Sequence, residues 1–457
     1  MTQGVKTRAI NRLQSMYALR AYVDKIYQAG LEAKKEGRPV AWCMAEGWAG
    51  PILEAMDVET VYPENYGTVC AALGRTAPFL ERADAEGFPT HLCGYARNGL
   101  GYAARMRDLG GEIPPEAPAG GMPKPTLLLA SGMACDARFK WFQAMGRYLD
   151  APLWTLESPS PGAREALMEG AYERDVNFLV KELRNFVTFL ERLLGKKMDW
   201  DRLEETREGT KEMNAVWYEV NELRKARPGP MHSRDFWSSM SASMYRGARD
   251  YEAITGLYRN MYDEVNYRVD NKIAGINREE KYRVTFIGLP PWHSLGFFDQ
   301  LAERGWNFVT EAAYHPLKPF DADLSMVSEP IERYVRSRYR GLAQSIYDDY
   351  EPEEASTIIE EIKREGSAHR LLYKSVRDFQ IDGAFLHPLL TCRAATFALP
   401  LVQTLLMEAW KVPSLVIAGD TVDISLFDPA DALKKAEAFE GIMDHYKGVR
   451  KEEGLEW

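Results

Sequence analysis

The chain has 457 residues, of which 46% are hydrophobic and 27% are charged, an ordinary composition for a globular protein. This length predicts two or three domains with ample material for hydrophobic cores. The net charge of −10 argues against a nucleic-acid partner, because nucleic-acid binding needs a basic surface. The five cysteines do not have the spacing of a disulfide framework. No apolar run reaches transmembrane length and the N-terminus lacks a secretory signal, so we expect a cytoplasmic protein with no membrane partner.

The first part of the chain, residues 1–164, is predicted to form an N-terminal helix and a first α/β domain. An amphipathic helical pattern extends to about Gly37. Helix-like segments then alternate with apolar, strand-like runs. These runs are RPVAWCMAE (38–46), VETVYP (58–63), TLLLAS (126–131) and APLWTLES (151–158). Such alternation predicts a parallel sheet that is flanked by helices.

Residues 165–276 are predicted to form a helical domain, because nearly the whole segment has helical periodicity. One apolar helix face is especially regular, and Gly195 ends it. This face comprises Val176, Leu179, Val180, Leu183, Val187, Leu190 and Leu194.

Strand–helix alternation resumes in residues 277–457, which are predicted to form a second α/β domain. The expected strands are YRVTFIGLPP (282–291), WNFVTEAAY (306–314), IDGAFLHPL (381–389) and VPSLVIAGD (412–420), and the last helix is expected at 429–447. The predicted fold class is therefore α/β. It has two flavodoxin-like or Rossmann-like parallel sheets with a helical segment between them.

Three cysteines carry the main functional signal. Cys93, Cys135 and Cys392 are each predicted to lie where a strand-like run gives way to a helix. Ligands gather at such ends in open α/β sheets, and helix N-termini favour thiolates. Three converging thiolates predict a metal or iron–sulfur site with one open coordination position. From spacing alone, however, buried packing cysteines are an equally good interpretation.

The other two cysteines serve as internal comparisons. Cys70 lies on an apolar helix face and is expected to belong to the core, whereas Cys43 lies at a strand end and is ambiguous. There is no C-x-x-C pair, which excludes a zinc ribbon and a bacterial ferredoxin pattern.

Several polar residues are weaker candidates. His293, in a turn after a buried strand, is a candidate proton donor or acyl-group contact, although a hydrogen-bonded loop histidine is the more frequent case. His387 and His91 are close in sequence to Cys392 and Cys93 and could support a metal site. Glu64, in PENYG (63–67), could either cap a helix or be a polar anchor in a cleft. No P-loop and no G-x-G-x-x-G motif is present, so ATP and dinucleotide binding by those routes is not expected.

Four segments together resemble the benzoyl-CoA reductase and 2-hydroxyacyl-CoA dehydratase family. They are VYPENYG, HLCGYARNGLGYAARM, LLLASGMACDARFKWFQ and the late cysteine after DGAFLHPLLT. The resemblance covers most of the chain and is most specific around Cys93 and Cys135. It implies that Cys93, Cys135 and Cys392 bind a [4Fe–4S] cluster between two α/β domains. It also implies a heterodimer with a related cluster-binding subunit and a separate ATP-hydrolysing iron–sulfur activator, which the missing P-loop fits.

Within this resemblance the middle and end of the chain are more similar to the larger subunit of an ATP-dependent benzoyl-CoA reductase. The expected activity is therefore reduction of the ring of an aromatic acyl-CoA to a cyclic diene. The resemblance associates dehydratases with a serine-rich strand end near the start, where this chain reads AWCMAEGWAG. A 2-hydroxyacyl-CoA dehydratase subunit is the alternative, with Lewis-acid chemistry at the open iron. A cluster-free acyl-CoA-binding scaffold is a third.

Overall fold

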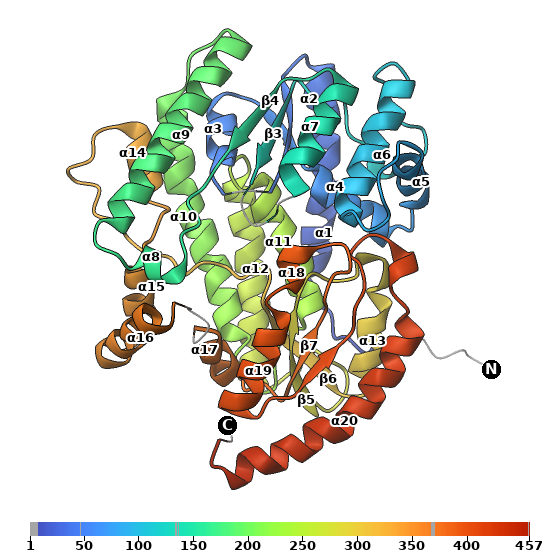
Figure 1. Ribbon diagram of the computed structural model, residues 1–457, viewed down its shortest axis with the longest axis vertical. Coiled ribbons are helices and arrows are strands. Elements are labelled where there is room, and N and C mark those ends of the chain that lie inside the picture. The colour runs from blue at the N-terminus through green and yellow to red at the C-terminus, as the bar shows by residue number, and fades with distance from the viewer. Residues whose placement is uncertain (1–7, 46, 133–134, 136, 367–370, 456) are drawn as a thin grey trace.

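The computed structural model describes residues 8–45, 47–132, 135, 137–366, 371–455 and 457, and within them two four-stranded sheets lie one above the other (Figure 1). Every neighbouring pair of strands is parallel. The first sheet contains β1 (Val40–Cys43), β2 (Glu59–Val61), β3 (Leu127–Ser131) and β4 (Leu153–Leu156). The second contains β5 (Tyr282–Ile287), β6 (Trp306–Glu311), β7 (Gly383–Leu386) and β8 (Ser414–Val416). The predicted α/β fold with two parallel sheets is confirmed.

The strands form because their apolar runs are buried on both faces of each sheet. Every residue of β1, β3, β5, β6 and β7 is buried. This is typical of parallel sheets, in which helices cover both faces. It explains why these strands read as continuous apolar runs rather than as alternating ones.

Both sheets are wound in the same way, with the orders β2-β1-β3-β4 and β6-β5-β7-β8. In each sheet the chain reverses its winding direction at one point, between β1 and β3 and between β5 and β7. Ligand crevices in open α/β sheets form outside the carboxyl ends of the strands at such a point. The segments after β3 and β7, which carry Cys135 and Cys392, therefore begin at the two crevices.

The first sheet is accompanied by helices from the first third of the chain. The predicted single N-terminal helix is in fact two helices, α1 (Ser15–Val23) and α2 (Ile26–Lys35). The others are α3 (Ala49–Ala55), α4 (Pro63–Ala72), α5 (Ala77–Ala85), α6 (Gly94–Asp108), η1 (Pro118–Gly120) and α7 (Ala137–Leu149).

The middle of the chain is helical, as predicted. It contains α8 (Ala163–Ala166), α9 (Ala171–Leu194), α10 (Trp200–Leu223), α11 (Ser233–Arg246) and α12 (Tyr251–Asp270). The predicted apolar face of α9 is buried except at its last residue, Leu194, and Gly195 ends the helix with φ +66°, a conformation that favours glycine. Helix α1 packs on α11 and α12, and its Met16 and Leu19 join their apolar core.

The remaining helices accompany the second sheet and extend back along the helical segment. They are η2 (Trp292–Ser294), α13 (Gly296–Glu303), α14 (Pro330–Arg336), α15 (Leu342–Asp349), α16 (Pro352–Glu365), α17 (Leu371–Asp378), α18 (Arg393–Thr396), α19 (Leu399–Trp410), η3 (Ile424–Leu426) and α20 (Pro429–Glu452). Figure 1 shows α14, α15 and α16 beside the green helices, where α14 contacts α9 and where α15 and α16 contact α8. The boundaries at 164/165 and 276/277 stay a prediction.

None of the helices in the described part of the chain is both long and apolar enough to cross a membrane.

Candidate metal–thiolate site

The three cysteines lie at the N-terminal ends of three helices. Cys93 is the residue that precedes α6, Cys392 precedes α18, and Cys135 lies two residues before α7. Cys135 and Cys392 follow β3 and β7, as predicted. The prediction was wrong for Cys93, because helix α5 and a loop precede it rather than a strand. The loop before Cys93 reads GFPTHL (87–92), and Pro89 has no N–H to donate to a strand ladder, which disfavours a strand there.

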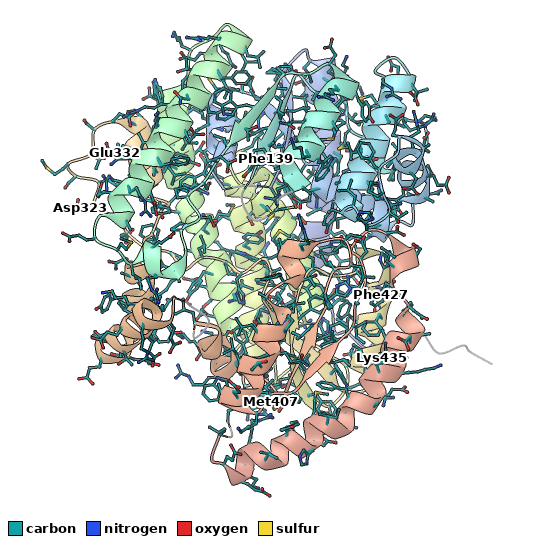
Figure 2. The ribbon with its side chains drawn as sticks, in the orientation of Figure 1. Phe139, Asp323, Glu332, Met407, Phe427 and Lys435 are labelled. Atoms are coloured by element: carbon teal, nitrogen blue, oxygen red, sulfur yellow. The ribbon has the colours of Figure 1, made fainter. Side chains whose placement is uncertain are left out.

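One cavity of about 690 Å³ brings the three cysteines together, and we call it the cysteine cavity. Cys93 and Cys135 reach it from the first α/β unit and Cys392 from the second, although 257 residues separate the last two in the chain. The other lining residues are Phe88, Pro89, His91, Leu92, Leu100, Ala137, Lys140, Trp141, Leu390, Thr391 and Arg393. Figure 2 shows the two units that meet here, with Phe139 on the first turn of α7 and Phe427 beside the second sheet.

Burial makes the thiolate forms of two of these cysteines unfavourable. Burial raises the pKa of Cys93, and the charges of Asp420, Cys135 and Glu64 raise it further. A hydrogen bond from the backbone N–H of Ala96 lowers it. Burial likewise raises the pKa of Cys392. Without a cation both groups are therefore thiols at neutral pH, and a bound metal would displace their protons.

The surroundings of the cavity suit a negatively charged group. Among the described lining residues, His91, Lys140 and Arg393 are basic and none is acidic. The backbone N–H groups of Ala394 and Ala395 lower the pKa of Cys392, as donors at the start of a helix do. Basic side chains and helix N-termini together offset the charge of a thiolate-bound cluster.

The arrangement of Cys93, Cys135 and Cys392 bears on which kind of metal group they could hold. Within the residues described, no three His, Cys, Asp or Glu side chains are close enough to hold a single metal ion. A polynuclear cluster needs a wider arrangement, because its own irons and sulfides separate the cysteine sulfurs. Three thiols around one cavity are a donor set of the kind that holds an iron–sulfur cluster.

Cys70 differs from these three cysteines in its place in the fold, because it lies within a helix and does not line the cysteine cavity. It is fully buried in α4, as expected for a core residue, and burial raises its pKa to about 12. Its thiol contacts the side chains of Asn98 and Tyr66. Cys43 is also buried, at the end of β1 in the same core.

Glu64 lies in the first turn of α4 and is paired with a residue of the helix that follows Cys135. Its carboxylate accepts a hydrogen bond from Arg138 at 3.2 Å, and Arg138 lies three residues after Cys135. The charge of Glu64 is among the causes that raise the pKa of Cys93 and of Cys392, after burial. The sequence left Glu64 open between a helix cap and a cleft anchor. No side-chain cap was found at this helix start, and the contacts favour the anchor.

His293 is held by the protein at both ring nitrogens. Nε2 donates to the Asp420 carbonyl at 3.0 Å, and Nδ1 lies 2.8 Å from the Ser294 hydroxyl. Burial lowers its pKa, and it is not one of the described residues that line the cysteine cavity. The role of His293 as a proton donor stays a prediction.

His387 is fully buried and neutral. Its Nδ1 donates to the Leu289 carbonyl at 2.7 Å, and burial lowers its pKa to about 4. It supports the turn after β5 and does not line the cysteine cavity, whereas His91 does.

Comparison with known proteins shows to which family the chain belongs. A family model described as 2-hydroxyglutaryl-CoA dehydratase, D-component, matches residues 51–440, which include all three cysteines. This chain belongs to that family. The family-level resemblance read from the sequence is thus confirmed, and the family consists of enzyme subunits.

Relatives within the family catalyse different reactions. Lactoyl-CoA dehydratase subunit alpha of Anaerotignum propionicum is 23% identical, over 97% of this chain and 98% of the relative. The (R)-phenyllactyl-CoA dehydratase alpha subunit of Clostridium sporogenes is 27% identical, over 68% of this chain and 72% of the relative. A benzoyl-CoA reductase subunit of Thauera aromatica is 23% identical, over 90% of each chain. At these identities the family is established and the reaction is not.

Proposed function

We propose that this chain is the iron–sulfur subunit of an ATP-dependent aromatic acyl-CoA reductase that acts on benzoyl-CoA or a close analogue. The observation that carries the proposal is the convergence of Cys93, Cys135 and Cys392 on one cavity. Cysteines that only fill a hydrophobic core would not be expected to gather at the N-terminal ends of helices from two different α/β units. Cys70, a packing cysteine of the same chain, is enclosed by core residues instead.

In this proposal the three cysteines would hold a [4Fe–4S] cluster, which would supply one-electron transfer and one coordination position free of protein thiolate. The chain's own residues prepare the site. Lys140, Arg393 and the helix starts offset negative charge, while Trp141, Leu92 and Leu100 provide apolar walls. The Glu64–Arg138 pair joins the start of α4 to the start of α7, the helix that follows Cys135. Two electrons and two protons would convert the aromatic ring to a cyclic diene, so the site must also admit protons.

The end of β1 favours reduction over dehydration. The segment after Cys43 reads MAEGWAG and contains no serine, and Met44 is buried there. The resemblance read from the sequence associates dehydratases with a serine-rich segment at this place. The missing serines are the feature of this chain that weighs against the dehydratase in this proposal.

Partner subunits are part of the proposal. The three relatives are all named as subunits of a dehydratase or a reductase, which implies that they work in complexes with other subunits. For this chain we propose a heterodimer with a related cluster-binding subunit. We further propose a separate ATP-hydrolysing activator, because the chain has no P-loop of its own.

A 2-hydroxyacyl-CoA dehydratase subunit is the second candidate. The matching family model and the lactoyl-CoA and phenyllactyl-CoA relatives favour it. In that case the open coordination position would act as a Lewis acid on the substrate oxygen.

Two measurements on the complex, purified without air together with its co-purifying subunit, test the proposal. About four irons and four acid-labile sulfides per copy of this chain are expected. With activator, ATP and a strong reductant, the complex should then consume the ring absorbance of benzoyl-CoA. Turnover of a 2-hydroxyacyl-CoA alone would replace the first candidate by the second. Folded protein without iron would leave only a scaffold role.

A further inference from the structure

A loop of the second α/β unit, residues 419–423, follows β8 and pairs with the segment that carries Cys392. The Leu390 N–H donates to the Gly419 carbonyl at 2.9 Å, and the Gly419 N–H donates to the Pro388 carbonyl at 3.1 Å. These bonds continue the parallel pairing of β7 and β8 past the ends of the two strands. The 419–423 loop and the Cys392 segment therefore form one hydrogen-bonded piece.

Asp420 is a buried carboxylate in this loop and is 1% exposed. Its Oδ1 accepts the backbone N–H groups of Val422 and Asp423, each at 2.8 Å. Its Oδ2 accepts a hydrogen bond from the hydroxyl of Thr391, the residue before Cys392. One carboxylate thus fixes the shape of its own loop and also holds the residue beside a cysteine of the cavity.

The same carboxylate lies against the residue beside Cys93. Gly94 follows Cys93 and begins α6, which belongs to the first α/β unit. A Cβ atom at Gly94 would overlap Asp420 Oδ1 and would lie 3.0 Å from Val422 Cβ, so glycine is needed for this close approach. Asp420 is therefore in contact with the neighbours of two cysteines that come from different α/β units.

Two further contacts hold the first turn of α6 on the second unit. Arg97, which is 2% exposed, donates to Asp423 Oδ2 at 2.7 Å. The Tyr95 hydroxyl accepts from Trp292 Nε1 at 2.6 Å, and the Trp292 N–H donates to the Thr421 carbonyl at 3.2 Å. Charge-assisted hydrogen bonds of this kind fix direction as well as distance. The 419–423 loop is thus attached to both sides of the cysteine cavity.

These contacts exceed what Asp420 needs to shape its own loop. The two backbone N–H groups are sufficient for that purpose. The bond from Thr391 and the approach of Gly94 connect Asp420 to the two cysteine segments instead. Because Cys93 and Cys392 come from different units, any relative shift of the units would separate their thiols, and Asp420 acts against such a shift. Groups that orient metal ligands in this way typically contribute 10–100-fold to metal affinity.

We infer that Asp420 is a positioning residue, which holds Cys93 and Cys392 in place relative to each other across the two α/β units before a metal group binds. The inference rests on the proposed function in taking these two thiols as ligands of a cluster. It holds for a reductase and for a dehydratase alike, because it concerns the assembly of the site and not the reaction.

Two pairs of variants test the role of Asp420 in the anaerobic complex. Asp420→Ala removes all of its contacts. Asp420→Asn preserves them, because Oδ1 still accepts the two N–H groups and Nδ2 can donate to the Thr391 hydroxyl oxygen. If Asp420→Ala does not fold, Thr391→Val and Thr391→Ser replace it, since valine keeps the shape of threonine without the hydroxyl and serine keeps the hydroxyl. The control is Asp428→Ala, at an exposed residue that also accepts two backbone N–H groups, at the start of α20.

The first measurement is the chelator concentration that removes half of the iron. It should fall by about tenfold or more in Asp420→Ala and Thr391→Val, and by less than about twofold in Asp420→Asn, Thr391→Ser and Asp428→Ala. The clusters that remain in Asp420→Ala should have an altered EPR spectrum, which a general loss of stability would not produce. Equal iron retention in Asp420→Ala and Asp428→Ala would overturn the inference, and so would an equal loss in Asp420→Ala and Asp420→Asn.

A second measurement does not depend on the cluster. A short bis-maleimide is added to the metal-free complex, and the peptide that links Cys93 to Cys392 is quantified by mass spectrometry. Its yield should be several-fold lower in Asp420→Ala than in the unmodified protein, and an equal yield would overturn the inference. An unmodified complex that contains no iron would refute the proposed function, whereas the positioning role would still be decided by the cross-link.

Discussion

Arg138 Nη2 lies 3.2 Å from Glu64 Oε2, and this ion pair joins the first turn of α7 to the first turn of α4. Arg138 lies three residues after Cys135, so the pair places a carboxylate near the segment that carries this thiol. The charge of Glu64 is also among the causes that raise the pKa of Cys93 and of Cys392. A charge in that place influences both the binding of a metal group and its reduction potential.

Glu64→Gln should therefore shift the reduction potential of the bound cluster to a less negative value, because removal of a nearby negative charge makes an added electron less unfavourable. We expect the iron content to be retained. A potentiometric titration followed by EPR checks this. Glu81→Gln, at an exposed residue of α5, is the control and should leave the potential unchanged. The same potential in both variants would show that Glu64 does not act on the cluster.

Cys135→Ala should abolish iron binding, whereas Cys70→Ala should leave it intact. Cys135 lines the cysteine cavity, and Cys70 is a core thiol whose pKa is raised to about 12. Cys70→Ala should instead lower the free energy of unfolding by about 1 kcal/mol, because it leaves a small cavity in the core. Iron and acid-labile sulfide analysis of both variants decides the matter, and equal iron content would remove Cys135 from the ligand set.

Acidification should destabilise the protein through His387. Burial lowers the pKa of His387 from 6.5 to about 4, so between these values the unfolded state binds a proton that the folded state does not. Stability is thus lost as the pH falls through this window, by about 2 kcal/mol between pH 7 and pH 5. Urea unfolding at both pH values measures the loss.

The His387→Gln variant should lose correspondingly less stability over the same pH range. His445→Gln, at an exposed residue of α20, should behave like the unmodified protein. A pH dependence in His387→Gln as large as that of the unmodified protein would exclude this histidine as the cause.

The ion pair of Arg224 and Glu311 should be a main determinant of stability. Both side chains are fully buried, and the two guanidinium–carboxylate contacts are 2.7 and 2.8 Å long. The pair connects the end of α10 to the last residue of β6. Glu311→Gln leaves a buried charge without its partner, which typically costs about 3–5 kcal/mol.

Glu212→Gln is the control for this prediction, because Glu212 pairs with Arg259 at the surface, with side chains 56% and 62% exposed. Its loss should cost less than about 1 kcal/mol. Denaturant unfolding compares the two variants. Similar free energies of unfolding would mean that the buried pair contributes no more than an exposed one.

The sequence by itself determined the local structure. The eight apolar runs became the eight described strands, because short runs between helical segments have few ways to bury their side chains. The amphipathic face of α9 and its end at Gly195 also followed from periodicity and from the freedom of glycine at positive φ. The cysteine motifs were sufficient to identify the family.

Only the tertiary structure decided which residues meet. From the spacing of the cysteines alone their convergence stayed open, and the fold brings Cys392 to the same cavity as Cys93 and Cys135. The strand expected before Cys93 is absent from the described chain there, where a helix and a loop stand instead. The Glu64–Arg138 pair likewise combines segments that are distant in sequence. Periodicity reports which side chains are buried, whereas a site depends on long-range packing that fixes where they lie.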